Sequence, residues 1–139
     1  MEKGFKILEH PADIGIEAYG SNLKAAFEQS AIALMSVILD SSKINNTESR
    51  LIEMFASDYE QLLVKWLSEV LYLYDGENFV AGGFEIETLT SNYLKAKVKV
   101  EKFNIFKHPT KLDVKGITYH QIFIKEDETG GLVRVYLDI

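Results

Sequence analysis

The fold is decided by residues 57–76, SDYEQLLVKWLSEVLYLYDG. Apolar side chains recur through this stretch at helical spacing, which predicts one long amphipathic helix. Ser57 and Glu60 have the spacing of a capping box, so we expect the helix to begin there. Asp75-Gly76 should end it, with the glycine supplying a left-handed turn. The single tryptophan, Trp66, lies in the apolar stripe and is assigned to the core rather than to stacking on a ligand.

Upstream of this helix the sequence predicts three strands and a further helix. Alternating apolar and polar residues indicate the strands, and apolar residues at helical spacing after Ser21-Asn22, a suitable N-cap, indicate the helix. The expected strands are residues 4–9, 14–19 and 50–56, and the expected helix is residues 22–39.

Downstream the sequence predicts four more strands, rich in Val, Ile, Phe and Tyr. They are residues 79–88, 94–103, 117–125 and 132–137. The order ββαβα followed by four strands predicts the α+β class, as a single two-layer domain with a mainly antiparallel sheet and two principal helices on one side. At 139 residues, without repeats or a proline-rich linker, the chain is expected to form one domain over residues 1–139.

Composition narrows the class of protein. Hydrophobic residues make up 47% and charged residues 26%, as in folded globular proteins, and there is no cysteine for disulfides or thiolate metal ligands. The longest apolar stretch, residues 31–39, is far short of the about 20 residues that span a bilayer, so we expect a cytoplasmic protein. The same short stretch argues against a membrane protein. A net charge of −6 would repel a phosphate backbone, which argues against a primary nucleic-acid binder.

Motifs of the common enzyme families are missing. The chain has no glycine-rich phosphate loop, no G-x-S-x-G elbow, no H-E-x-x-H helix and no paired Asp-x-Asp. Gly82-Gly83 within an expected strand favours a bulge. The acidic residues 126–128 lack the ligand spacing of an EF-hand loop and favour a solvated hairpin turn. We therefore expect a protein without catalytic activity of its own.

Two groups of potential metal ligands lie at the ends of expected strands. The turn His10-Pro11-Ala12-Asp13 holds an imidazole and a carboxylate, and Asp138 precedes the terminal Ile139. If the fold brings Asp13 to Asp138, these oxygens form a pocket suited to calcium, magnesium or manganese. The alternatives are that Asp13 accepts hydrogen bonds from its own turn and that His10 is structural.

Several lysines are candidates for contact with a partner. Lys115 either balances the carboxylates, contacts a partner's anionic site, or is simply solvated. Lys95, Lys97 and Lys99 alternate with apolar residues and should share one face of a strand. That face is either a solvated sheet face or edge guarded against aggregation, or a surface that binds a partner.

The ordered combination of these segments resembles the archease family. The resemblance covers the whole chain and is carried by FKILEHPADIGIEAYG (residues 5–20), LKAAF (23–27), DYEQLLVKWL (58–67), VKGITYH (114–120) and LDI (137–139). It implies a metal-binding protein that activates an RtcB-type RNA ligase in tRNA splicing and RNA repair, by promoting guanylylation of the ligase and multiple turnover. The rival readings are a stand-alone metal-dependent hydrolase and a general chaperone or modulator with a structural metal.

The resemblance also implies site residues. The family's metal ligands fall on Asp13, Asp138 and Ile139, its functional lysine falls on Lys115, and His10 is a further candidate. Calcium is the expected cation, with manganese or magnesium as alternatives. There are two departures from the family pattern. Pro11 replaces a threonine, and Val100-Glu101 replaces Gly-Glu, which puts a role for Glu101 in doubt.

Overall fold

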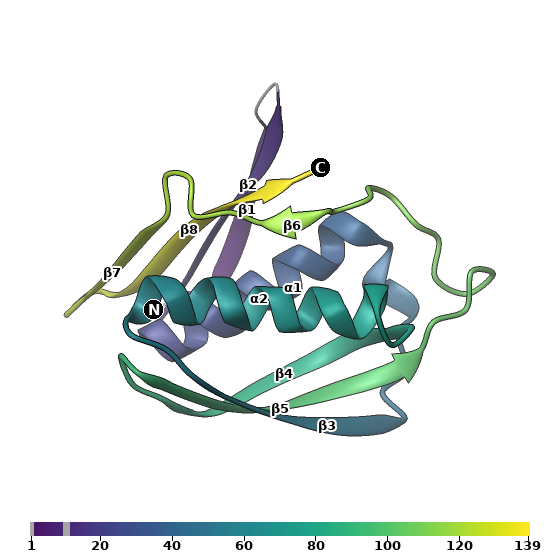
Figure 1. Cartoon of the computed structure of the whole chain (residues 1–139), viewed down its shortest axis with the longest axis horizontal. Helices are drawn as coiled ribbons and strands as arrows, with labels where there is room; N and C mark the ends of the chain where they lie inside the picture. Colours follow the sequence, from purple (N-terminus) through teal and green to yellow (C-terminus); the bar gives the residue numbers. More distant parts are fainter. Residues whose placement is uncertain (1, 10–11) are drawn as a thin grey trace.

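The computed structural model describes residues 2–9 and 12–139 of the chain. Figure 1 shows the helices in the middle of the molecule with strands on two sides. The helices are α1 (Leu23–Ile38), η1 (Ser41–Lys43, a 3-10 turn) and α2 (Tyr59–Asp75). The strands are β1 (Gly4–Glu9), β2 (Asp13–Gly20), β3 (Glu48–Phe55), β4 (Phe79–Leu89), β5 (Tyr93–Lys102), β6 (Gly116–Ile117), β7 (Phe123–Asp127) and β8 (Gly130–Asp138).

The described strands form two antiparallel sheets. One has the order β1-β2-β8-β6, with β7 also paired to β8, and the other has the order β3-β5-β4. The α+β class, the antiparallel pairing and the two principal helices are therefore confirmed. The prediction of a single main sheet with both helices on one side was wrong, because there are two sheets and α1 and α2 each contact both of them.

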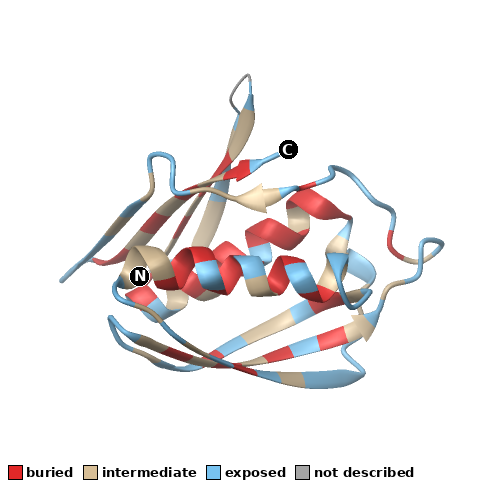
Figure 2. Cartoon of the chain, in the orientation of Figure 1, coloured by how far each residue is buried: buried red, intermediate tan, exposed pale blue. Residues whose placement is uncertain are grey.

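The pattern of buried residues on α1 explains why the fold has a second sheet. Its buried residues include Leu23, Phe27, Ala31 and Leu34 on one stripe, but also Ala33 and Val37 on another side. A helix that is buried on most of its sides needs covering from more than one direction. Figure 2 shows this band of buried residues along both helices, between the two sheets.

The ends of α2 differ in detail from the sequence prediction. Asp58, not Ser57, is the N-cap, and its side chain accepts a hydrogen bond from the Gln61 amide at 2.8 Å. The Gln61 side chain accepts from the Ser57 amide rather than from the Asp58 amide, so the cap is displaced by one residue and the two hydrogen bonds do not form a reciprocal pair. At the other end Gly76 is right-handed, and Asn78 takes the left-handed conformation with φ 64°. Asparagine tolerates that region better than most residues.

The expected strand 117–125 was wrong as a single element. Ile117 lies opposite Leu137 in β8, and Phe123 lies opposite Arg134. Residues 118–122 therefore lie opposite only residues 135–136 of β8, so they are too many to pair with that strand one to one. The unpaired residues form a turn, in which Gln121 has φ 52°.

The acidic residues 126–128 lie at a hairpin as expected, but Glu126 and Asp127 belong to β7, and the Glu126 carboxylate accepts a hydrogen bond from the Leu23 amide at 2.7 Å. Two other local predictions, the bulge and the buried tryptophan, are confirmed. The β4–β5 pairing shifts register between Ala81 and Gly83, which is the predicted bulge. Trp66 is fully buried, and its Nε1 donates to the Phe27 carbonyl at 3.0 Å. No helix in the described part of the chain has the length and apolar composition needed to cross a membrane.

Candidate functional site

Pairing of β2 with β8 brings the two candidate aspartates together. Asp13 is the first residue of β2 and Asp138 is the last residue of β8, and the antiparallel register places them directly opposite one another. The register is held along the whole length of β2, down to Gly20 opposite Gly131. A one-residue slip would turn the buried residues Ile16 and Val135 out of the core, so the core fixes this opposition.

Directly opposite residues project to the same face of a sheet, with Cβ atoms about 5 Å apart. Asp13 is half-buried and Asp138 is exposed, so the two carboxylates share one face at the rim of the sheet. Like charges in this position repel unless a cation or a basic group compensates them. The pair is therefore a suitable oxygen ligand set for a hard divalent cation.

Lys115 approaches Asp138 from the other side of β8. Its backbone amide donates to the Asp138 carbonyl at 2.7 Å, and the next residue, Gly116, lies opposite Asp138 in the β6–β8 pair. The Lys115 side chain is exposed. A Cβ built on Gly116 meets nothing within 4 Å, so the space beside Asp138 is open. The structure thus gathers Asp13, Asp138 and Lys115 at one end of one sheet.

Ile139 follows Asp138 directly and is 37% exposed. His10 and Pro11 lie outside the described residues. Within residues 2–9 and 12–139, no three His, Asp or Glu side chains gather closely enough to hold a metal ion. The described side chains that could hold a cation here are therefore the two aspartates, and main-chain groups such as those of Ile139 could supply further oxygens. This donor set fits calcium, manganese or magnesium and does not fit a soft metal.

The lysine-rich strand is not an edge. Lys95, Lys97 and Lys99 share one face of β5 as expected, but β5 is the central strand of its sheet, so the edge-guard interpretation was wrong. Lys95 and Lys97 lie beside acidic residues of the neighbouring strands, and Lys95 pairs with Glu87 at 3.9 Å. The solvated sheet face is the interpretation that the register supports.

Glu101 has a structural role that the sequence left in doubt. Its carboxylate accepts hydrogen bonds from the Asn45 amide at 2.8 Å, from Lys107 Nζ, and from His108 Nε2 at 2.9 Å. His108 is fully buried, and its Nδ1 accepts from the Asn104 amide, which assigns the proton of the neutral ring to Nε2. These contacts, with that from Lys107 the strongest, lower the pKa of Glu101 to about 2.

This cluster fastens the start of the segment 103–115, which leads from β5 to Lys115. No spacing in the sequence marks it, because Asn45 lies far away along the chain and the other partners lie in an irregular loop.

Comparisons with known proteins agree with this architecture. The model of the Archease protein family (MTH1598/TM1083) matches residues 5–139. The archease of Sulfolobus acidocaldarius is 39% identical over 136 residues, covering 97% of this chain and 98% of the relative. The archease of Pyrococcus furiosus is 45% identical over 120 residues, covering 84% of each chain.

Two solved structures have the same fold. The solution structure of Methanobacterium thermoautotrophicum protein 1598 superposes with a TM-score of 0.83 at 30% identity, covering 98% of this chain and 99% of that one. The crystal structure of an archease, described as a possible chaperone, from Thermotoga maritima has a TM-score of 0.64 at 18% identity over 96% of each chain, which supports the fold alone. With a family match over nearly its whole length and relatives at this level of identity, the chain belongs to the archease family.

Proposed function

We propose that this archease is a metal-binding accessory protein that activates an RtcB-type RNA ligase, by promoting guanylylation of the ligase and allowing multiple turnover. The observation that carries the proposal is the opposition of Asp13 and Asp138 beside Lys115, at the open end of one sheet. Membership of the archease family supports it. The motifs of nucleotide hydrolases are missing from the sequence, which favours an accessory role over an enzyme.

In this proposal Asp13, Asp138 and a main-chain oxygen of Ile139 hold one divalent cation, with calcium as the first choice. A bound cation would supply positive charge of the kind that stabilises a phosphoryl group during transfer. The two aspartates orient their carboxylates from the ends of paired strands, so their spacing is set by the sheet rather than by a flexible loop.

Lys115 contributes differently. Its backbone is tied to Asp138, while its side chain is exposed and so accessible to a partner. A protonated lysine has no lone pair for a metal ion, so its ammonium suits an anionic group of the ligase or of its nucleotide. We expect Lys115→Ala to lower stimulation of the ligase about tenfold, the effect of losing one charged hydrogen bond, with metal binding kept. Lys102→Ala, an exposed lysine at the end of β5, is the matched control and should retain stimulation.

The test is to titrate the protein into a reaction containing an RtcB-type ligase, GTP, and RNA with 3′-phosphate and 5′-hydroxyl ends. Stimulation by substoichiometric amounts, together with faster guanylylation of the ligase, is expected. GTP hydrolysis by the protein alone would instead favour the hydrolase. Protection of unrelated proteins from aggregation, without an effect on the ligase, would favour the general chaperone suggested by the description of the Thermotoga maritima protein.

RNA binding is a separate check on the same proposal. With a net charge of −6, the isolated protein should not retain RNA at physiological salt. Tight RNA binding in a filter assay would contradict the accessory role and would direct attention to the lysines of β5.

A further inference from the structure

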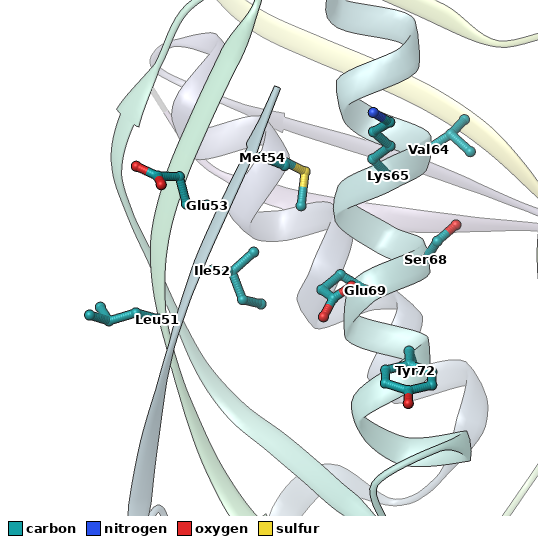
Figure 3. Close-up of a pocket in the computed structure, with 9 residues that line it drawn as sticks. All are labelled: Leu51, Ile52, Glu53, Met54, Val64, Lys65, Ser68, Glu69 and Tyr72. Carbon is teal, nitrogen blue, oxygen red and sulfur yellow. The ribbon is translucent and has the colours of Figure 1, made fainter. Parts of the chain in front are cut away.

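An open groove of about 580 Å³ lies between α2 and β3, in a part of the fold that the candidate site does not use (Figure 3). Its wall on β3 is made by Leu51, Ile52, Glu53 and Met54, and its wall on α2 by Val64, Lys65, Ser68, Glu69 and Tyr72. Apolar side chains remain accessible around it. Leu51 is 72% exposed and Tyr72 is 54% exposed.

One wall of the groove is the edge of a sheet. Among the described strands, β3 pairs only with β5. The Ala56 amide donates to the carbonyl of Asn92, just before β5, and Lys65 Nζ reaches from α2 to the Phe55 carbonyl at 2.8 Å. Backbone groups alternate in direction along an antiparallel pair, so the odd-numbered residues of β3 direct their N–H and C=O groups away from β5. The main chain of Leu51 and Glu53 therefore faces the groove.

The other wall follows the edge in parallel. Val64, Ser68 and Tyr72 are spaced by four residues, so they form a row along one side of α2. From residue 64 to residue 72 the helix rises about 12 Å, which equals about four residues of extended chain. A strand edge alongside a helix is the arrangement in which domains such as PDZ bind an extended peptide by adding it to the sheet.

We propose that this groove binds an extended segment of a partner protein, which pairs with β3 at Leu51 and Glu53 and alternates apolar and basic residues. Side chains of an added strand alternate between the two faces of the sheet. Those on the α2 side meet Met54, Tyr72 and Glu69, and those on the outer face lie beside Glu53.

Charge selects the partner. The groove has two carboxylates, Glu53 and Glu69, and one ammonium, Lys65, which already donates to the Phe55 carbonyl. Glu53 accepts a hydrogen bond from the Tyr93 hydroxyl at 2.5 Å and lies opposite Lys95 on β5, whereas the Glu69 carboxylate has no hydrogen-bond or ion-pair partner among the described residues. Figure 3 shows Glu69 on the side of α2 that faces Ile52. A segment with basic side chains complements this surface, whereas a second copy of the chain in a two-fold interface would present the same glutamates to it. The occupant is therefore a different chain, and the inference is independent of the metal site.

The experiment uses the full-length ¹⁵N-labelled protein and a capped hexapeptide that alternates lysine and valine. NMR titration is expected to shift the amides of Leu51 and Glu53 together with those of residues 64–72, and to slow hydrogen exchange at the two strand amides. A peptide with glutamate in place of lysine is the matched control and should bind at least about tenfold more weakly, since like charges face each other.

Two variants separate edge pairing from charge. Leu51→Pro removes the outward-facing donor at a position where an edge strand tolerates proline, and should weaken the lysine peptide about tenfold. Glu53→Lys combined with Glu69→Lys should reverse the preference in favour of the glutamate peptide. This second variant preserves the test if Leu51→Pro is poorly folded.

Three results would overturn the proposal. The first is a set of shifted amides on another face of the molecule. The second is equal binding of the two peptides, which would show that charge does not select the occupant. The third is a dimer in sedimentation equilibrium that Leu51→Pro dissociates, which would make a second copy the occupant.

Discussion

The opposition of Asp13 and Asp138 leads to a prediction with opposite signs in the presence and absence of metal. Like charges directly opposite in an antiparallel pair destabilise it by roughly 0.2–1 kcal/mol. Asp138→Asn removes one of the two charges without changing the size of the side chain. We therefore expect this variant to be more stable than the parent without metal, by about 0.5 kcal/mol. For a chain of 139 residues this raises the melting temperature by about 2 °C.

In the presence of metal the order of stability reverses, and the parent should be more stable than Asp138→Asn. A cation that binds only the folded protein stabilises it by about 2.7 kcal/mol when its free concentration is one hundred times its dissociation constant. For this chain length that is about 9 °C in melting temperature. Asp138→Asn loses a charged ligand, so most of this increment should disappear, and the variant should melt below the parent in the same calcium or manganese concentration.

The assay is thermal unfolding followed by circular dichroism, in EDTA and in excess calcium or manganese. Calorimetric titration should give one site in the parent, and much weaker binding in Asp13→Ala and Asp138→Ala. Glu128→Gln, an exposed acidic residue in the β7–β8 turn, is the control and should behave like the parent. An Asp138→Asn protein that is less stable without metal and keeps the full increment with metal would refute the reasoning.

Three further predictions test the neighbouring chemistry. A few residues added after Ile139 should crowd the cation and lower both metal affinity and ligase stimulation, with the melting temperature of the metal-free protein almost unchanged. Trp66→Phe loses the hydrogen bond to Phe27 and leaves a gap in the core, so urea unfolding should show a loss of about 2 kcal/mol with metal affinity unchanged. Glu101→Gln should cost about 2 kcal/mol at neutral pH. Because the pKa of Glu101 is lowered to about 2, its contribution is present above pH 4.5 and is lost as the pH falls from 4.5 towards 2, so parent and variant should converge there.

Local patterns predicted the elements well, because each depends on neighbours along the chain. The helix 22–39 and the strand 4–9 were predicted close to their observed bounds. The strand 117–125 failed because its length had to match β8, and that constraint comes from pairing with a distant segment. The N-cap of α2 moved by one residue because Asp58 and Ser57 are both competent caps, and only the packed geometry chooses between them.

The candidate site was partly predictable for a similar reason. The sequence showed oxygen ligands at two strand ends, and the register of β2 with β8 is what brings them together. The edge position of β3 and the groove beside α2 left no trace in the sequence, since strand order in a sheet depends on contacts between segments that are far apart. The buried His108 was missed because its partners come from an irregular loop.

The segment that carries Lys115 shows why stability and function can be separated in this fold. Hydrogen bonds hold the segment at three places. At its start His108 contacts Glu101. In its middle the Asp40 amide donates to the Pro109 carbonyl and the Lys111 amide donates to the Ile38 carbonyl, and at its end the Lys115 amide donates to the Asp138 carbonyl. Loss of the contact at the start leaves the other hydrogen bonds in place. Glu101→Gln should therefore lower the free energy of unfolding and yet leave Lys115 beside Asp138. Its stimulation of the ligase should stay close to that of the parent at temperatures well below the melting transition, whereas Lys115→Ala should lose stimulation without losing stability.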